Sequence, residues 1–231
     1  MVKITAGSEV IDKLLGGYET DIITTVYGPA GAGKTLLCIL CSAEVARAGK
    51  KVLYIDTEGG FSTIRVKQIY PDYKKILANM VFLKPVSFKG QKKAFEKLKE
   101  LVNSDIGLII VDTISMLYRL ELGTSEEVYE VNRDLGKQIA YLSEISRKKD
   151  IPVLITNQVY ANFDEKGKVN MVGGDILKYG SKCILELQVF RNSLRRAILK
   201  KHRSIAEEKF IEFKIVEKGI STVNKEKSLL F

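Results

Sequence analysis

Apolar runs alternate with amphipathic segments through the first two thirds of the chain, and this alternation predicts β-strands separated by helices. Strands are predicted at residues 22–27, 51–56, 106–112 and 151–156. Helices are predicted at residues 34–47, 61–69, 89–102 and 125–148. The run at 106–112 is almost uninterrupted, which is typical of a central parallel strand that is covered on both faces.

The last third of the chain has a different pattern. Residues 184–190, 197–200 and 210–216 read as three strands without long helices between them, which predicts meander pairing at one edge of the sheet. Residues 159–173 are polar and rich in glycine and asparagine, so they predict a loop. We therefore expect an α/β fold in one domain spanning residues 1–231, with a mostly parallel central sheet, flanking helices and an antiparallel C-terminal extension.

Composition excludes several classes of protein. The 45% of hydrophobic residues and the four prolines indicate a folded globule, and no apolar run reaches membrane-spanning length. The first residues lack the apolar core of a secretion signal, so a cytoplasmic protein is expected. Cys38 and Cys41 lie three residues apart on a predicted buried helix, and Cys183 stands alone. With His202 as the single histidine, reduced core thiols are favoured over a zinc site.

A glycine-rich segment between the first strand and the first helix carries the strongest chemical signal. It fits the phosphate-loop pattern G-x-x-x-x-G-K-[ST] in full: Gly28, Pro29, Ala30, Gly31, Ala32, Gly33, Lys34 and Thr35, followed by Leu36. The glycines let several backbone N–H groups converge on one phosphate, and the helix N-terminus adds positive potential. Lys34 can reach the β- and γ-phosphates, and the Thr35 hydroxyl can bind magnesium. We therefore predict an ATP and Mg²⁺ site.

Two carboxylates follow predicted strands. Asp112 ends the buried run at 106–112, where α/β sheets place their ligands, and there it can hold the magnesium shell. Glu58 follows the strand at 51–56 and can accept a proton from a water that attacks the γ-phosphate. From spacing alone, a solvated turn residue is an equally good interpretation of Glu58.

The segment Tyr-Ile-Asp-Thr-Glu-Gly-Gly-Phe at residues 54–61 closely resembles the segment of RecA and RadA recombinases that carries the catalytic glutamate. The resemblance implies that Glu58 is the catalytic base and that Arg65, seven residues later, packs on the adenine ring. It also implies that Gln158, in Ile-Thr-Asn-Gln-Val, senses the γ-phosphate. Residues 7–17 resemble the entry segment of the same family.

The resemblance extends from about residue 5 to residue 222 and is strongest to RadB, the short archaeal branch of the RecA/RadA superfamily. The larger members carry an N-terminal helical DNA-binding domain and a linker, whereas this chain begins at the ATPase core. The resemblance implies a RecA-type fold and a nucleoid-associated, slowly hydrolysing ATPase that helps DNA repair and homologous recombination. Its implied partners are DNA, bound with weak to moderate affinity, repair proteins and a second copy of the chain.

The resemblance implies that two segments could hold the DNA-facing loops of that family. The first is residues 113–127, where Arg119 is the single cation, and the second is residues 160–173, with Lys166 and Lys168. Both carry little positive charge, so strong strand-exchange activity is not expected.

The net charge of +9 is concentrated near the C-terminus, where residues 191–231 hold eleven Lys or Arg against five Asp or Glu. The densest part contains Arg195, Arg196, Lys200, Lys201, His202 and Arg203. These residues could bind nucleic-acid phosphates, form a solvated edge, or reach a neighbour's γ-phosphate, as the similar Lys-x-Arg of KaiC-like ATPases suggests. A KaiC-like regulatory ATPase that acts on protein partners without DNA is the alternative function, and a non-hydrolysing, ATP-gated binding module is a further one.

Overall fold

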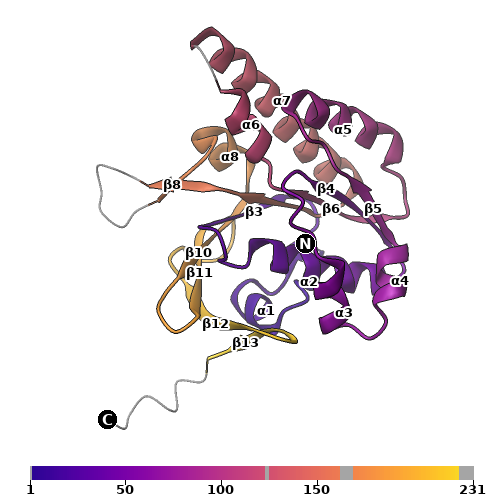
Figure 1. Ribbon diagram of the computed structural model, residues 1–231, viewed down its shortest axis with the longest axis vertical. Coiled ribbons are helices and arrows are strands. Elements are labelled where there is room, and N and C mark those ends of the chain that lie inside the picture. The colour runs from indigo at the N-terminus through magenta and orange to yellow at the C-terminus, as the bar shows by residue number, and fades with distance from the viewer. Residues whose placement is uncertain (1, 123–124, 162–168, 224–231) are drawn as a thin grey trace.

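A nine-stranded sheet organises the computed structural model, which describes residues 2–122, 125–161 and 169–223 (Figure 1). Its strands are β3 (Ile23–Tyr27), β4 (Lys51–Asp56), β5 (Met80–Leu83), β6 (Ile106–Asp112), β7 (Val153–Asn157), β10 (Cys183–Val189), β11 (Leu194–His202), β12 (Phe210–Val216) and β13 (Gly219–Thr222). Their order is β13-β12-β11-β10-β3-β7-β6-β4-β5. The strands from β10 to β5 pair in parallel, and β11, β12 and β13 continue the sheet in antiparallel pairing. The predicted parallel sheet with an antiparallel extension is confirmed.

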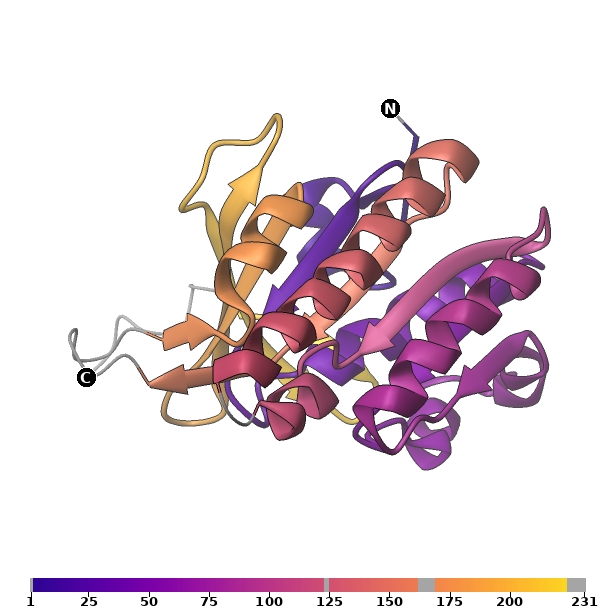
Figure 2. The same ribbon diagram turned by 90° about the horizontal axis from the view of Figure 1, so that it is seen from above.

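Helices cover both faces of this sheet. One layer holds α1 (Glu9–Leu15), α2 (Lys34–Arg47), α3 (Thr63–Ile69) and α4 (Tyr73–Ala78), and the other holds α5 (Phe88–Leu101), α6 (Met116–Glu121), α7 (Ser125–Lys149) and α8 (Gly174–Gly180). Figure 2 shows α7 and α5 running along the second face of the sheet. Two hydrophobic clusters fill the space on either side of the strands. Because both faces of the parallel strands are buried, they read as continuous apolar runs in the sequence.

Helix α2 follows the phosphate loop and is almost wholly buried. Leu37, Cys38 and Cys41 have no exposed surface, and burying a leucine side chain stabilises the fold by about 1.5–3 kcal/mol. Cys38, Cys41 and Cys183 are all free and buried, as predicted. The loop between β3 and α2 is therefore anchored at both ends by core elements.

Short elements account for most differences from the sequence prediction. The helix at 34–47 and the strands at 51–56, 106–112 and 210–216 have the predicted bounds. The predicted loop at 159–173 was wrong in part, because β8 (Val159–Ala161) pairs with β9 (Val169–Met171) inside it. The small sheet of β1 (Lys3–Ile4) and β2 (Tyr18–Glu19) was also not predicted. Among the described residues, no helix is long and apolar enough to cross a membrane.

Candidate nucleotide-binding site

The glycine-rich segment forms a loop between the end of β3 and the start of α2. Gly28, Gly31 and Gly33 all have positive φ angles, of 153°, 72° and 105°, which favour glycine. Gly28 also lies against β10, where a Cβ atom would come within 2.3 Å of the carbonyl oxygen of Leu187. Gly28 is therefore required by the close approach of β10, whereas Gly31 and Gly33 are favoured by their positive φ angles.

The Lys34 ammonium lies inside this loop. Its Nζ donates to the carbonyl oxygens of Gly28 at 2.8 Å and Pro29 at 3.0 Å. The backbone N–H of Ala32 donates to the same Pro29 oxygen at 3.3 Å. Burial lowers the pKa of Lys34, and the nearby negative charges of Glu58 and Asp112 oppose that shift. An ammonium and an amide N–H thus converge on one oxygen, an arrangement that suits a phosphate oxygen in its place.

Asp112 lies buried at the end of β6 and accepts hydrogen bonds from hydroxyl groups. Tyr54 Oη donates to Asp112 Oδ2 at 2.8 Å, and the Thr156 hydroxyl donates to Oδ1. Burial raises the pKa of Asp112, and hydrogen bonds from Thr156, Thr35 and Tyr54 oppose the shift. A carboxylate beside the Thr35 hydroxyl is a hard-oxygen donor set that fits Mg²⁺, which would stabilise the ionised carboxylate.

Glu58 meets Gln158 across the ends of β4 and β7. Gln158 Nε2 donates to Glu58 Oε1 at 2.6 Å, and the Thr113 hydroxyl donates to the same oxygen at 3.0 Å. The turn that carries Glu58 is fixed by Asp56, whose Oδ1 accepts from the N–H groups of Gly59 at 2.8 Å and Gly60 at 3.1 Å. The structure therefore brings together two residues that lie 100 positions apart in the sequence.

Arg65, on α3, lies at the hairpin between β12 and β13. Its guanidinium donates to the carbonyl oxygens of Val216 and Glu217. The same hairpin approaches the phosphate loop, because Ile215 lies 3.1 Å from the Cβ position that a side chain at Gly33 would occupy. Arg65 is thus tied to a hairpin beside the loop, and its contact with an adenine ring stays a prediction.

Several basic side chains on and after β11 are paired with groups on neighbouring elements. Arg196 Nη2 lies 2.6 Å from Glu212 Oε1, and its guanidinium stacks on Phe190 and Phe210, with ring centroids at 4.9 and 4.5 Å. Lys201 Nζ donates to the carbonyl oxygen of Lys178.

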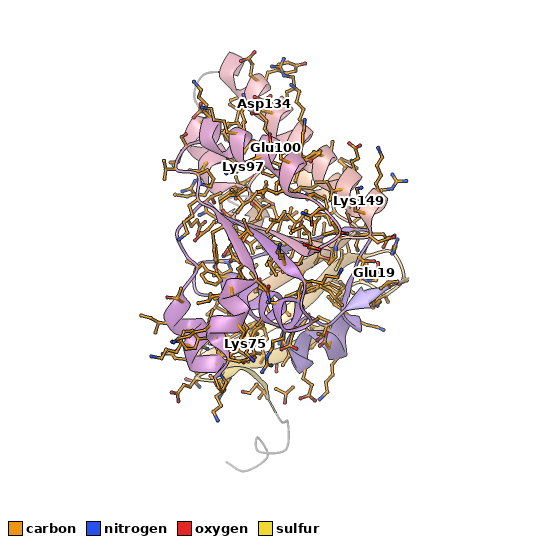
Figure 3. The ribbon with its side chains drawn as sticks, turned by 90° about the vertical axis from the view of Figure 1, so that its right-hand side faces the viewer. Glu19, Lys75, Lys97, Glu100, Asp134 and Lys149 are labelled. Atoms are coloured by element: carbon orange, nitrogen blue, oxygen red, sulfur yellow. The ribbon has the colours of Figure 1, made fainter. Side chains whose placement is uncertain are left out.

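Arg203, which directly follows the last residue of β11, is held by two carboxylates. Arg203 makes two hydrogen bonds to Asp21, at 2.8 and 2.6 Å, and its Nε lies 2.7 Å from Glu19 Oε2. Glu19, which follows Tyr18 on β2, is labelled in Figure 3. The proposed reach of Lys201 and Arg203 to a neighbour's nucleotide would have to break these contacts.

The predicted DNA-facing residues are placed only in part. Arg119 is exposed and lies on α6, within the segment at 113–127, and its contact with DNA stays a prediction. Lys166 and Lys168 lie outside the described residues.

Sequence reasoning missed the roles of Tyr54 and Thr156. Both lie within buried strands, where their hydroxyls reach Asp112 from neighbouring positions in space. A polar Thr156 in an apolar strand was the one local signal, since buried hydroxyls need a partner.

The chain is similar to one protein family in both sequence and structure. The family model described as Rad51 matches residues 1–223. A DNA repair and recombination protein RadB from Methanobrevibacter smithii is 40% identical over 227 residues, covering 94% of this chain and 95% of the relative. The RadB of Methanocaldococcus jannaschii is 42% identical over 215 residues, covering 91% and 98%. A crystal structure of the RadB recombinase superposes with a TM-score of 0.81 at 34% identity, covering 95% of this chain and 99% of that one.

Proposed function

Because this chain belongs to the Rad51 family, we propose that it is an ATP-dependent accessory protein of DNA repair and homologous recombination, of the RadB type. It binds ATP with Mg²⁺, hydrolyses the nucleotide slowly, and binds DNA or recombination partners. The names of its relatives support the repair role, and their high coverage of the chain supports a common overall activity.

One observation carries the catalytic part of this proposal: Gln158 and Thr113 both donate to Glu58 Oε1, next to the phosphate loop. Glu58 can orient a water molecule and accept its proton. Lys34 and the loop N–H groups would stabilise charge that develops on the γ-phosphate. Mg²⁺, held by Thr35 and Asp112, would neutralise further phosphate charge when it is bound.

Gln158 would report the state of the γ-phosphate. Its Nε2 now donates to Glu58, and its Oε1 is buried with no hydrogen-bond partner among the described residues. A γ-phosphate near Glu58 would compete for the Nε2 donor, and the amide would have to reorient. Because β8 begins at Val159, the next residue in the chain, a reoriented Gln158 would also shift the strand pair β8 and β9.

We expect slow hydrolysis because the proposed catalytic base is exposed to solvent. Glu58 is exposed, so bulk water competes with the attacking water for its carboxylate. Electrostatic stabilisation is weaker in a site that water reaches. A second subunit or a partner that covers Glu58 would therefore accelerate the reaction.

Glu58→Gln tests the catalytic assignment. We expect ATP hydrolysis to fall by about 10²–10⁴-fold, which is the usual contribution of a general base, while the Kd for ATP stays unchanged. Glu100→Gln is the matched control, because Glu100 (labelled in Figure 3) is an exposed carboxylate in the last turn of α5, near the start of β6. Glu58, in contrast, follows the end of β4, whose first residues pair with the start of β6. Hydrolysis at the wild-type rate in Glu58→Gln would remove the base and favour the non-hydrolysing binding module.

DNA binding separates the proposed function from its KaiC-like alternative. Single-stranded DNA retained on a filter at two salt concentrations, with and without ATP, gives the number of phosphates contacted from the salt dependence. We expect binding that weakens with salt. The absence of binding at low salt would favour a regulatory ATPase that acts on proteins alone.

A further inference from the structure

Arg195, at the start of β11, makes contact with the phosphate loop. Its Nε and Nη2 donate to the carbonyl oxygen of Gly31 at 3.2 and 3.1 Å. Its Nη1 donates to the carbonyl oxygen of Ser193 at 2.8 Å. Three N–H groups of the guanidinium therefore point at main-chain carbonyls, and two of them join β11 to a loop 164 residues away.

The alternation of β11 fixes this direction. Arg195 shares a face of the strand with Ala197 and Leu199, which are fully buried in the hydrophobic cluster around α2. Its neighbour Arg196 points to the opposite face, where it pairs with Glu212. The guanidinium of Arg195 is thus directed at the phosphate loop by the register of a packed strand.

The contact orients one peptide unit of the loop. The C=O of Gly31 and the N–H of Ala32 belong to the same planar trans peptide, so they point in opposite directions. When Arg195 holds the C=O toward β11, the N–H faces the loop interior, where it donates to Pro29 O at 3.3 Å. Lys34 Nζ donates to that same oxygen at 3.0 Å.

Packing restrains the peptide between Gly31 and Ala32 on one side only, because Ala32 is fully buried in the hydrophobic cluster whereas Gly31 is exposed. Gly31 has a φ angle of 72°, and among the described residues no atom lies within 4 Å of the Cβ position that a side chain would occupy. A glycine in open space samples many backbone conformations at little cost. The two hydrogen bonds from Arg195 therefore fix the Gly31 end of this peptide, which side-chain packing leaves free.

We propose that Arg195 is a positioning residue for the nucleotide site of its own subunit, and that it does not belong to a polyanion-binding surface. It holds the peptide between Gly31 and Ala32 so that its N–H is ready for a phosphate. The inference rests on the proposed binding of ATP. Because Arg195 orients this peptide before a nucleotide binds, it should strengthen the binding of ATP and of ADP by the same factor.

Arg195→Gln and Arg195→Lys test this role, with Arg191→Gln as the matched control from the same hairpin. The Kd values of ATP and ADP are measured by calorimetry, and backbone hydrogen exchange of residues 28–34 is measured without nucleotide. The affinity for single-stranded DNA is measured at several salt concentrations.

Arg195→Gln is expected to weaken ATP and ADP binding by roughly tenfold each, the effect of losing a charge-assisted hydrogen bond. Exchange at the Ala32 amide should rise, while the salt dependence of DNA binding stays at the wild-type value. Arg195→Lys should recover part of the nucleotide affinity, because an ammonium can still donate to Gly31 O. Arg191→Gln should bind both nucleotides as the wild type does.

Wild-type nucleotide affinity in Arg195→Gln, together with a shallower salt dependence of DNA binding, would overturn the inference and assign Arg195 to the polyanion surface. If the wild-type protein itself bound no nucleotide, the proposed function would fail. The exchange experiment needs no ligand, so unchanged protection of the Ala32 amide in Arg195→Gln would independently refute the role of Arg195.

Discussion

Two buried tyrosines offer a paired test of how the magnesium carboxylate is held. Tyr54 is 0% exposed and Tyr18 is 2% exposed, so both hydroxyls are withdrawn from water. Tyr54 Oη donates to Asp112 at 2.8 Å, whereas Tyr18 Oη has no hydrogen-bond partner in the described part of the chain. Replacing either tyrosine by phenylalanine deletes the same oxygen atom from two different environments.

The expected effects have different signs. Tyr54→Phe keeps the ring contacts with Phe61 and Phe82, at centroid distances of 5.1 and 5.5 Å, but it removes a donor from a buried carboxylate. A hydrogen bond to a charged group contributes about 1.5–3 kcal/mol, which in a chain of this size corresponds to a fall in Tm of roughly 3–12 °C. Tyr18→Phe removes a buried hydroxyl that no described residue satisfies, so its Tm should equal or exceed the wild-type value.

Thermal unfolding followed by circular dichroism measures both variants, first without ligand and then with ATP and Mg²⁺. We expect the Tyr54→Phe variant also to need more Mg²⁺ for the same stabilisation by ATP, because its Asp112 is held less firmly in the ionised form. Equal Tm shifts in the two variants, or an unchanged Mg²⁺ requirement, would refute the reasoning.

Three further outcomes are expected. Gly28→Ala should destabilise the fold by about 2–5 kcal/mol, since strain at positive φ adds to a clash with β10, whereas Gly31→Ala should cost only about 1–2 kcal/mol, and urea unfolding would compare them. Arg203 lowers the pKa of Asp21 through a hydrogen bond, so their pairing stabilises the fold above the ordinary carboxyl pKa and is lost as pH falls through the lowered one. Arg203→Gln should therefore have a lower Tm than the wild type at neutral pH, and a gap that stayed constant down to about pH 3 would contradict this pairing. Burial raises the pKa of Cys183 to about 12, so a thiol reagent should modify it only after unfolding, and rapid modification of the native protein would argue against its burial.

Local signals made much of this site predictable. The phosphate loop is a continuous motif between a strand and a helix, and Asp112 ends an apolar run, so each could be found without knowing the fold. Glu58 was ambiguous from spacing alone, and the resemblance to recombinases decided its interpretation. The hydrogen bond from Gln158 is consistent with that choice.

Long-range pairing made the rest unpredictable. The hydrogen-bond partner of Arg195 lies 164 residues away in the sequence, and that of Arg203 lies 182 residues away. The run of positive charge alone could therefore not predict which of its cations form hydrogen bonds within the protein. Tyr54 sits in an apolar strand and shows its polar role only when β6 is paired beside β4. The strands β8 and β9 are three residues each, too short to show a strand pattern in the sequence, and they form only because they pair with each other.

Calorimetric titration of ATP into the wild-type protein and into Lys34→Ala, with Mg²⁺ and again with a chelator, tests the central claim most directly. The loop around Lys34 is expected to give a saturable heat of binding that depends on Mg²⁺ in the wild type and is largely lost in the variant. A wild-type protein that releases no heat, or a Lys34→Ala variant that binds ATP equally well, would contradict the assignment of this loop as a nucleotide site.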